Sequence, residues 1–244
     1  MPTLALLLAF AATAPPTLPP AAAAELLRKS DVAACAPESF RAHLRITPQK
    51  QPPDPMEVEV WSSNESRSLV RFLGQKEKGK YLLRVDGVVW FLAPGARKPV
   101  KVGSAHRLRG SASVDEILGI RYARDYDIQS ATEAQETDGP VVVFDLAARV
   151  KQAPYPRVRY VVRRSTQRPV RAEFLLRSGK TSSVMEFLEW EAGARPVARR
   201  LLLTDRLLSD QRTEVTLLEM EERSVPSGLF DLTDGTARKS LEGP

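Results

Sequence analysis

Residues 79–102 read GKYLLRVDGVVWFLAPGARKPVKV, and this stretch decides the fold. Asp86 and Gly87 are a two-residue hairpin signal, because a type I′ turn needs a positive φ at both central positions. The flanking segments, Lys80 to Val85 and Val88 to Leu92, are therefore expected to pair as antiparallel strands. A short turn between consecutive strands predicts a meander and not a parallel βαβ fold.

The period-2 pattern of these strands continues along most of the chain. Segments of this kind, separated by short turns such as Ser178-Gly179-Lys180, are typical of a large antiparallel sheet or open barrel. The remaining predicted strands are Phe40 to Thr47, Met56 to Ser62, Ser66 to Leu73, Pro99 to Val102, Val141 to Val150, Arg157 to Arg164, Val170 to Leu176, Ser183 to Trp190, Pro196 to Thr204 and Thr213 to Glu222.

Several of these strands are apolar on both faces. Val88 to Leu92 reads VVWFL, Val141 to Leu146 reads VVVFDL, and Leu201 to Leu203 reads LLL. An antiparallel sheet with one face in water alternates, so these strands must be covered on both sides. A closed barrel, a second sheet, or a curved sheet around a cavity capped by short helices would each provide that cover. A two-sheet core without a ligand and an apolar ligand cavity both remain open at this point.

Two segments are predicted to be helical. Ala21 to Ala34 is rich in Ala, Leu, Glu, Arg and Lys, and Pro37 ends this helix. The second lies in the one long connection, Gly103 to Tyr126, where the period of 2 is lost. Long connections inside compact domains are often functional.

Within that connection, Ser113 or Asp115 is placed to cap a short helix that runs through Ile117 and Leu118 and ends at Gly119.

The N-terminal residues 1–24 contain no charged side chain and carry an apolar run followed by small residues, which predicts a secretory signal peptide cleaved within Ala21 to Ala24. The run is too short to span a bilayer. We therefore expect an exported protein with one domain over residues 25–235 and a polar, flexible tail over residues 236–244. Cys35, the only cysteine, excludes an internal disulfide, and charged residues just before it disfavour a lipid anchor there.

The formal net charge is +6, from 36 Lys and Arg against 30 Asp and Glu, with both signs interspersed. This favours a mildly basic surface attracted to anionic lipid or nucleic acid. Tyr81, Trp90 and Phe91 are residue types that single-strand binders use for stacking. An exported location and the alternation of these aromatics with aliphatic residues disfavour a nucleic-acid function.

Residues for catalysis are scarce. His43 shares a strand face with Arg41 and Arg45, as a solvated histidine would, whereas His106 lies in the long connection near Ser111 and is the only conceivable member of a hydrolase triad. No G-x-S-x-G elbow, metal-binding motif or glycine-rich phosphate loop accompanies it. The sequence predicts a protein that is not an enzyme and needs no cofactor or metal.

The order of features resembles a known family. The chain passes from AELLRKSDVAACAPESFRAHLRI to the opening hairpin, then to RLRGSASVDEILGIRYARDYDI, and closes with VPSGLFDL. This order is similar to that of the outer-membrane lipoprotein-sorting protein family, in its LolA-like branch, over essentially the whole mature chain. The hairpin and the DYD at Asp125 to Asp127 carry most of the resemblance. Gly110 to Ser113 departs from it, because the family often has Gly-Ser-Asp-Phe there.

The resemblance implies a mainly β fold with a few short helices: an open curved antiparallel sheet, a half-barrel of about 11 strands, capped by helices. It further implies a monomeric periplasmic carrier or chaperone that shelters acyl chains of lipids or lipoproteins on the way to the outer membrane, between an inner-membrane transporter and an outer-membrane acceptor. The alternative is a non-carrier envelope binding module that assists a membrane export system.

We expect the apolar cavity to be lined from the strands, with the short helix as its lid, and the basic residues after the hairpin to form a rim that meets an anionic membrane or partner. The predicted cavity and lid residues are Leu83, Val85, Val89, Phe91, Ile117, Leu118, Phe144, Leu175, Phe187 and Leu202. The predicted rim residues are Arg97, Lys98 and Lys101.

Overall fold

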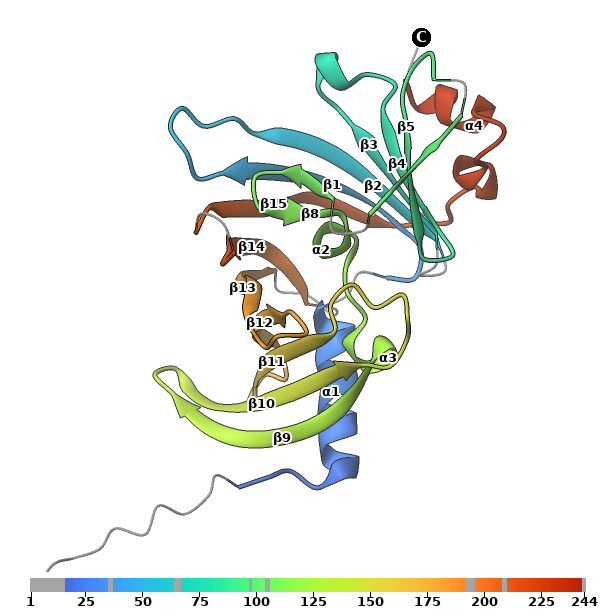
Figure 1. The fold of residues 1–244 in the computed structure, drawn as a ribbon. Coiled ribbons are helices and arrows are strands. Elements are labelled where there is room, and N and C mark those ends of the chain that lie inside the picture. The colour runs from blue at the N-terminus through green and yellow to red at the C-terminus, as the bar shows by residue number, and fades with distance from the viewer. Residues whose placement is uncertain are drawn as a thin grey trace, which may run out of the picture.

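The computed structural model describes residues 16–34, 37–63, 67–96, 98–103, 106–191, 196–207 and 210–242, and shows a mainly β chain with a few short helices (Figure 1). Cys35 and Arg97 lie outside the described residues. The strands are β1 (Phe40–Pro48), β2 (Met56–Ser63), β3 (Arg67–Phe72), β4 (Tyr81–Val85), β5 (Val88–Leu92), β6 (Val100–Val102), β7 (Arg107–Arg109), β8 (Ala112–Ser113), β9 (Tyr126–Glu136), β10 (Gly139–Ala148), β11 (Arg157–Arg163), β12 (Pro169–Leu175), β13 (Thr181–Glu191), β14 (Val197–Asp205) and β15 (Arg212–Glu222). The helices are α1 (Pro20–Ala34), α2 (Val114–Leu118), α3 (Tyr122–Asp125) and α4 (Thr236–Lys239), with short 3-10 turns η1 (Gln75–Glu77), η2 (Ser227–Phe230) and η3 (Ser240–Glu242).

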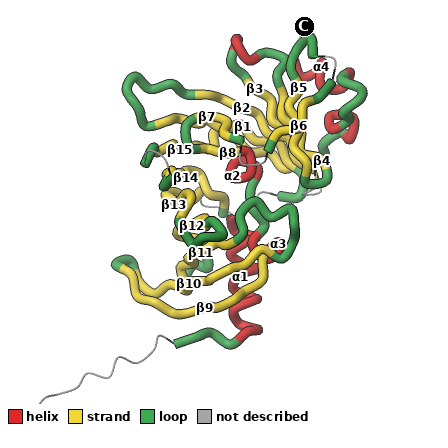
Figure 2. Tube along the Cα trace, viewed as in Figure 1, coloured by secondary structure: helices red, strands yellow, loops and turns green. Residues whose placement is uncertain are grey.

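One open antiparallel sheet dominates the fold, as predicted (Figure 2). It has 13 strands in the order β6-β5-β4-β3-β2-β1-β15-β14-β13-β12-β11-β10-β9, and β7 and β8 form a separate hairpin. Two meanders, β1 to β6 and β9 to β15, are the two wings of this sheet, and the pairing of β1 with β15 joins them. The expected count of about 11 was too low. The main omission was β9, which reads YDIQSATEAQE and has no apolar alternation.

The local signals in the sequence are confirmed. Asp86 and Gly87 have φ values of 49° and 77°, as a type I′ turn requires. Helix α1 begins one residue earlier than expected. Helix α2 has Ser113 as its N-cap in a capping box with Glu116, and Gly119, with φ of 81°, follows its last residue.

The inner face of the curved sheet packs against helices and the long connection (Figure 1). Leu27 of α1 and Tyr122 of α3 join one core cluster with strand residues such as Ile46, Phe144 and Tyr160. Asp31 of α1 accepts hydrogen bonds from the backbone N–H groups of residues 122 and 123, at 3.1 and 3.0 Å, and so ties α1 to α3. The predicted cover on this face is thus supplied by short helices and not by a second sheet.

The outer face of β2 to β5 has its own apolar cover, made by the C-terminal segment. Val225, Leu229 and Phe230 pack on Trp61, Leu69, Tyr81 and Leu83. This explains why the first wing is apolar on both faces.

Residues 236–242, expected to form a flexible tail, are instead helical, and Ala237 and Leu241 join the outer cluster. Arg238 is 4% exposed and donates a hydrogen bond to the carbonyl of Leu229 at 3.2 Å. The sequence suggested a tail because polar residues outnumber apolar ones there, but the two apolar side chains recur at a helical spacing of four.

A short N-terminal segment lies along the edge strand β9. Thr17 bridges Thr132, the N–H of Leu18 donates to the carbonyl of Ala131 at 2.9 Å, and the N–H of Glu133 donates to the carbonyl of Pro16 at 2.8 Å. The predicted cleavage run, residues 21–24, lies in the first turns of α1, and the signal peptide stays a prediction. Among the described residues, no helix combines the length and apolar character needed to cross a membrane.

The β7–β8 hairpin fastens the long connection to β14 and β15. The N–H of Ser111 donates to Oγ1 of Thr213 at 2.9 Å, and its Oγ donates to the carbonyl of Leu203 at 3.0 Å. Arg107 donates to the buried carboxylate of Asp205 at 2.9 Å. Gly110 allows this approach, because it has φ of 57° and a Cβ there would lie 2.3 Å from Oγ1 of Thr213.

We therefore expect Gly110→Ala to lower the free energy of unfolding by more than Gly179→Ala. Both positions have positive φ, which costs a non-glycine residue about 1–2 kcal/mol. No atom lies within 4 Å of a Cβ at Gly179, so only Gly110→Ala adds a clash and disturbs the Ser111–Thr213 hydrogen bond. Urea unfolding of both variants measures the difference. Equal losses would show that the hairpin does not pack tightly on β15.

Candidate functional site

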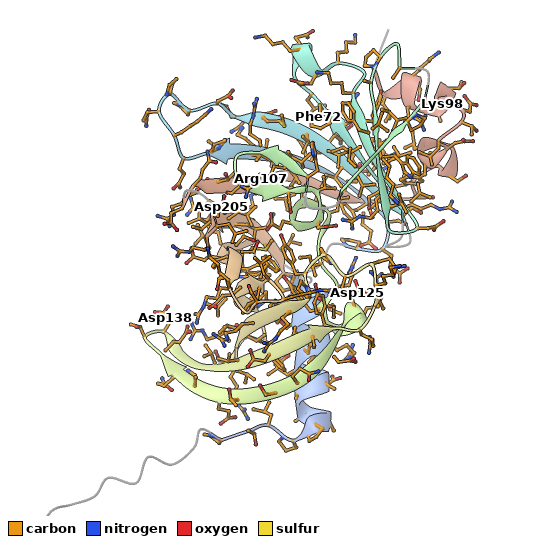
Figure 3. All side chains as sticks on the ribbon, viewed as in Figure 1. Phe72, Lys98, Arg107, Asp125, Asp138 and Asp205 are labelled. Atoms are coloured by element: carbon orange, nitrogen blue, oxygen red, sulfur yellow. The ribbon has the colours of Figure 1, made fainter. Side chains whose placement is uncertain are left out.

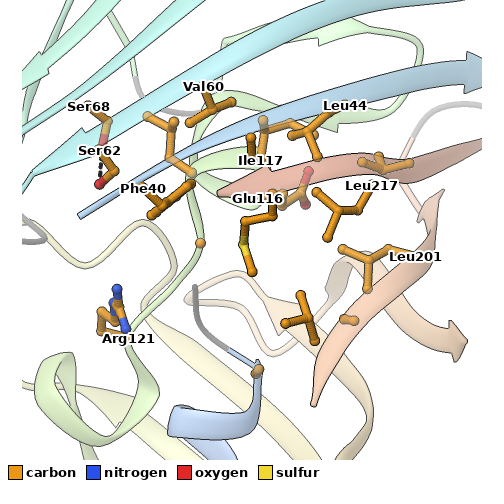
Figure 4. Close-up of a pocket in the computed structure, with 18 of the residues that line it drawn as sticks. Phe40, Leu44, Val60, Ser62, Ser68, Glu116, Ile117, Arg121, Leu201 and Leu217 are labelled. Atoms are coloured by element: carbon orange, nitrogen blue, oxygen red, sulfur yellow. Dashed lines mark hydrogen bonds between the residues drawn. The ribbon is translucent and has the colours of Figure 1, made fainter. Parts of the chain in front are cut away.

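An apolar hollow of about 130 Å³ lies on the inner face where the two wings meet (Figure 4). Strands β1, β2, β14 and β15 form its wall, α2 covers it, and the C-terminal end of α1 reaches it. Its apolar lining comprises Ala34, Phe40, Ala42, Leu44, Val60, Ile117, Leu118, Val197, Ala198, Leu201, Val215, Leu217 and Met220. An apolar lining of this extent favours hydrocarbon.

One end of the hollow is polar. Ser62, Ser68 and Arg84 lie side by side on β2, β3 and β4, because Ser62 is the cross-strand partner of Ser68 and Ser68 is the partner of Arg84. The hydroxyls of Ser62 and Ser68 are 3.4 Å apart, and both residues are buried. Arg121 reaches the same side of the hollow (Figure 4). The next row along the strands is apolar, with Ala42, Val60, Val70 and Leu82 as successive partners.

Arg84 links the first wing to α2 through an ion pair with Asp115. The side chains are 15% and 9% exposed, so the pair is largely removed from water. Burial lowers the pKa of the Arg84 guanidinium, and the carboxylate of Asp115 acts against that shift. A buried pair of this kind is destabilised strongly when one partner is removed, because the other charge is left uncompensated.

Glu116 links α2 to the second wing. Its Oε2 accepts hydrogen bonds from the backbone and side chain of Ser113, at 2.9 and 2.8 Å. Its Oε1 accepts from the hydroxyl of Tyr155 at 2.9 Å and from that of Ser183 at 3.0 Å. Burial, together with the charge of Glu116, raises the pKa of the Tyr155 hydroxyl. Polar contacts to both wings therefore hold α2 over the hollow.

A second, more polar cavity of about 350 Å³ lies beside the hollow and shares Arg84, Gly119 and Arg124 with it. The β4–β5 turn contributes Asp86, and the connection between β10 and β11 contributes Gln152. The end of α2 and the residues after it thus border both the apolar hollow and this cavity.

The predicted cavity residues divide into three groups. Ile117 and Leu118, expected as lid contacts, line the hollow. Val89, Phe91, Phe144 and Phe187 lie on the inner face in the core cluster but outside the lining of the hollow. Leu83, Val85, Leu175 and Leu202 lie on the outer face.

The strand parity expected for those last four residues was wrong. Leu83 and Val85 pack under the C-terminal segment. Leu202 has Glu186 and Glu214 as cross-strand partners. Leu175 directly follows Phe174, which lies in the inner core, so the normal alternation of β12 turns Leu175 to the outer face, where its cross-strand partner is the exposed Arg157. Apolar strands with both faces buried do not reveal which side faces a hollow.

The predicted rim lies on the edge strand β6 and the loop before it. Lys98 and Lys101 are exposed, and Figure 3 shows Lys98 near the C-terminal helices. Lys101 is the cross-strand partner of Trp90 and so shares the outer face with it. Arg97 is outside the described residues.

Among the residues that the structure describes, no triad is assembled around His106. Ser111 donates its hydroxyl hydrogen bond to Leu203, and Asp115 pairs with Arg84. His43 lies between Arg41 and Arg45 on the strand, as expected, with Nε2 2.9 Å from Glu57. Within the described parts of the chain, no group of three or more His, Cys, Asp or Glu side chains could hold a metal ion.

The sequence reasoning missed the polar residues of the hollow. Ser62 continues the face of Val58 and Val60 in MEVEVWSS, and Arg84 continues the face of Leu82 in YLLRV. The sequence did contain a signal for these residues. At the end of each strand a polar residue stands where the alternation of the buried face predicts an apolar one.

A family model described as "-like: Uncharacterized protein" matches residues 64–234. The fold is similar to that of a LolA superfamily protein from Nitrosomonas europaea, with 22% identity, a TM-score of 0.78, and coverage of 85% of this chain and 96% of that one. It is also similar to a domain from Vibrio parahaemolyticus described as an outer membrane lipoprotein-sorting protein, with 12% identity, a TM-score of 0.71, and coverage of 90% and 97%.

A DUF1329 family protein from Desulfovibrio piger has 14% identity, a TM-score of 0.72, and coverage of 86% and 96%. The comparison with curated proteins found no match. At these identities the likeness to solved structures establishes a LolA-like fold.

The contacts of Glu116 predict that Tyr155→Phe loosens α2. Losing a buried donor to a charged acceptor costs about 1–3 kcal/mol of unfolding free energy. Tyr81→Phe is the matched control, because its hydroxyl donates to the neutral carbonyl of Arg238 at 3.2 Å, away from α2. We expect Tyr155→Phe to be the more destabilising and to speed amide hydrogen exchange in α2. Unchanged exchange in α2 would show that Glu116 does not hold the lid.

Proposed function

We propose that this chain, which belongs to the family whose model matches residues 64–234 and has a LolA-like fold, is a carrier that shelters acyl chains in the hollow beneath α2. The observation that carries the proposal is the apolar hollow on the inner face, closed by a short helix through polar contacts. The protein from Vibrio parahaemolyticus, which shares the fold, is described as sorting outer membrane lipoproteins.

The size of the hollow suits a carrier in a closed state. Its volume of about 130 Å³ is below the roughly 300–1,000 Å³ of pockets for drug-sized ligands. An apolar engineered cavity of about 150 Å³ remains dry and binds benzene. The closed form therefore has room for only part of a lipid chain, and movement of α2 would admit more.

Reversible binding follows from partial burial. Each buried CH₂ group contributes about 0.8 kcal/mol, so the affinity grows with the length of chain that is sheltered. A carrier that shelters a limited length can release its cargo to a tighter acceptor without any chemical step. We propose that the protein is not an enzyme, acts as a monomer in the periplasm, and moves lipids or lipoproteins from an inner-membrane transporter to an outer-membrane acceptor.

A second candidate function is that of an envelope binding module which carries no lipid and assists a membrane export system. The observation that favours it is the free edge strand β6, where Lys98 and Lys101 are exposed and Val100 is 57% exposed. A basic, partly apolar edge is suited to an anionic membrane surface. The two functions differ in whether the hollow is ever occupied.

Filling the hollow separates them. We expect Leu201→Trp to abolish co-purification of lipid or lipoprotein from the cell envelope, because the indole occupies the space beneath α2. Leu188→Trp is the matched control, since Leu188 is on β13, is 44% exposed and is outside the lining. Mass spectrometry of extracted lipid measures the result. A wild-type protein without bound lipid or lipoprotein would refute the carrier function.

The basic edge is tested by charge reversal. We expect Lys98→Glu/Lys101→Glu to weaken binding to phosphatidylglycerol vesicles by about tenfold or more, since each basic residue near an anionic surface contributes about 1 kcal/mol. Lipid content should stay unchanged. Lys76→Glu/Lys78→Glu alters the net charge equally at the exposed turn η1 and is the control. Equal weakening by both pairs would show that β6 is not the docking edge.

A further inference from the structure

The hollow is polarised along its length. At one end, Ser62 and Ser68 present buried hydroxyls beside Arg84 on adjacent strands. At the other end, Leu201 and Leu217 present hydrocarbon, and the neighbouring Arg199 is paired with Glu191. Figure 4 shows the two serines and Arg121 on one side of the space and the two leucines on the other. A ligand that fits both ends has a polar head and an apolar tail.

Arginine is the most frequent charged residue in the lining of the hollow. Four arginines line it, Arg84, Arg121, Arg124 and Arg199, against the single carboxylate of Glu116. That carboxylate accepts hydrogen bonds from Ser113, Tyr155 and Ser183, so its charge is directed into the protein.

The carboxylates that pair with the arginines leave donors for a ligand. Arg84 pairs with Asp115, Arg124 with Asp125 and Arg199 with Glu191. A guanidinium has five N–H donors, and a carboxylate engages at most two of them in a bidentate pair. Planar guanidinium groups match the oxygens of a phosphate, and serine hydroxyls add neutral donors.

We propose that the ligand of the hollow is an amphiphile with an anionic, phosphate-type head, bound with the head at Ser62, Ser68, Arg84 and Arg121 and the acyl tail toward Leu201 and Leu217. This inference rests on the proposed carrier function and defines its substrate class. A neutral acyl group would leave the buried hydroxyls and guanidinium groups without a ligand partner, and a cationic head offers no acceptor for these N–H and O–H donors. The head-and-tail arrangement also orients the cargo within the sheet.

Three soluble probes with one chain length test the proposal: decyl phosphate, 1-decanol and decyltrimethylammonium. Isothermal titration calorimetry is performed below the micelle concentration at physiological ionic strength, which screens charges beyond about 8 Å. We expect decyl phosphate to bind about tenfold or more tightly than 1-decanol, as charge-assisted hydrogen bonds do in buried sites, and decyltrimethylammonium to bind most weakly.

Variants locate the head group. Arg121→Gln should reduce the preference for decyl phosphate several-fold and leave 1-decanol binding unchanged, with Ser68→Ala as a second, milder variant. Arg84 is left unchanged, because its substitution would remove the ion pair of the buried Asp115 carboxylate. Arg177→Gln removes the same charge from the exposed β12–β13 turn and is the control.

The outcomes separate the chemistry of the head group from the carrier function. Equal binding of decyl phosphate and 1-decanol overturns the anionic head but leaves the carrier function standing. Equal effects of Arg121→Gln and Arg177→Gln also overturn it, because the preference would then reflect net charge. Binding of none of the probes by the wild-type protein overturns the carrier function itself.

Discussion

The pairing of β1 with β15 is the constraint on which the rest of this structure depends. It brings together residues that are 165 to 182 positions apart, with Phe40 opposite Glu222 and Pro48 opposite Thr213. Without this pairing the chain is two separate meanders, each with an uncovered apolar face. With it, the sheet is continuous from β6 to β9, and the inner residues of β1, β2, β14 and β15 form one wall of the hollow. Contacts between distant residues carry a large entropic cost of chain closure, and burial of the shared core offsets it.

The long connection between β6 and β9 packs against that wall. Its hairpin is bonded to β14 and β15 through Ser111, and its helix α2 is bonded to the first wing through Asp115 and to the second through Glu116. The ion pair with Asp115 also holds Arg84 at one end of the hollow. Arg84 therefore belongs both to the contacts that hold α2 and to the polar end of the site.

Much of the fold could be predicted from local patterns. The Asp86-Gly87 turn, the α2 capping signal and the alternation of most strands were read correctly, because each depends on residues near one another in sequence. Strand β9 was missed because, as an edge strand with mixed polar residues, it lacks the burial that produces alternation. The C-terminal segment was misjudged because its apolar residues acquire their role only on the outer face of β2 to β5.

The candidate site was less accessible to sequence reasoning. Leu83 and Val89 are equally apolar, yet one faces the C-terminal cover and the other the inner core, because both faces of the first wing are buried. Cross-strand register, which no single strand contains, places Ser62, Ser68 and Arg84 in one row. The sequence by itself determined an antiparallel sheet covered on both faces and interrupted by one capped helix, since those features follow from alternation and turn chemistry. Only the tertiary structure decided which face surrounds a hollow and which of its ends is polar, because both depend on pairing between distant strands.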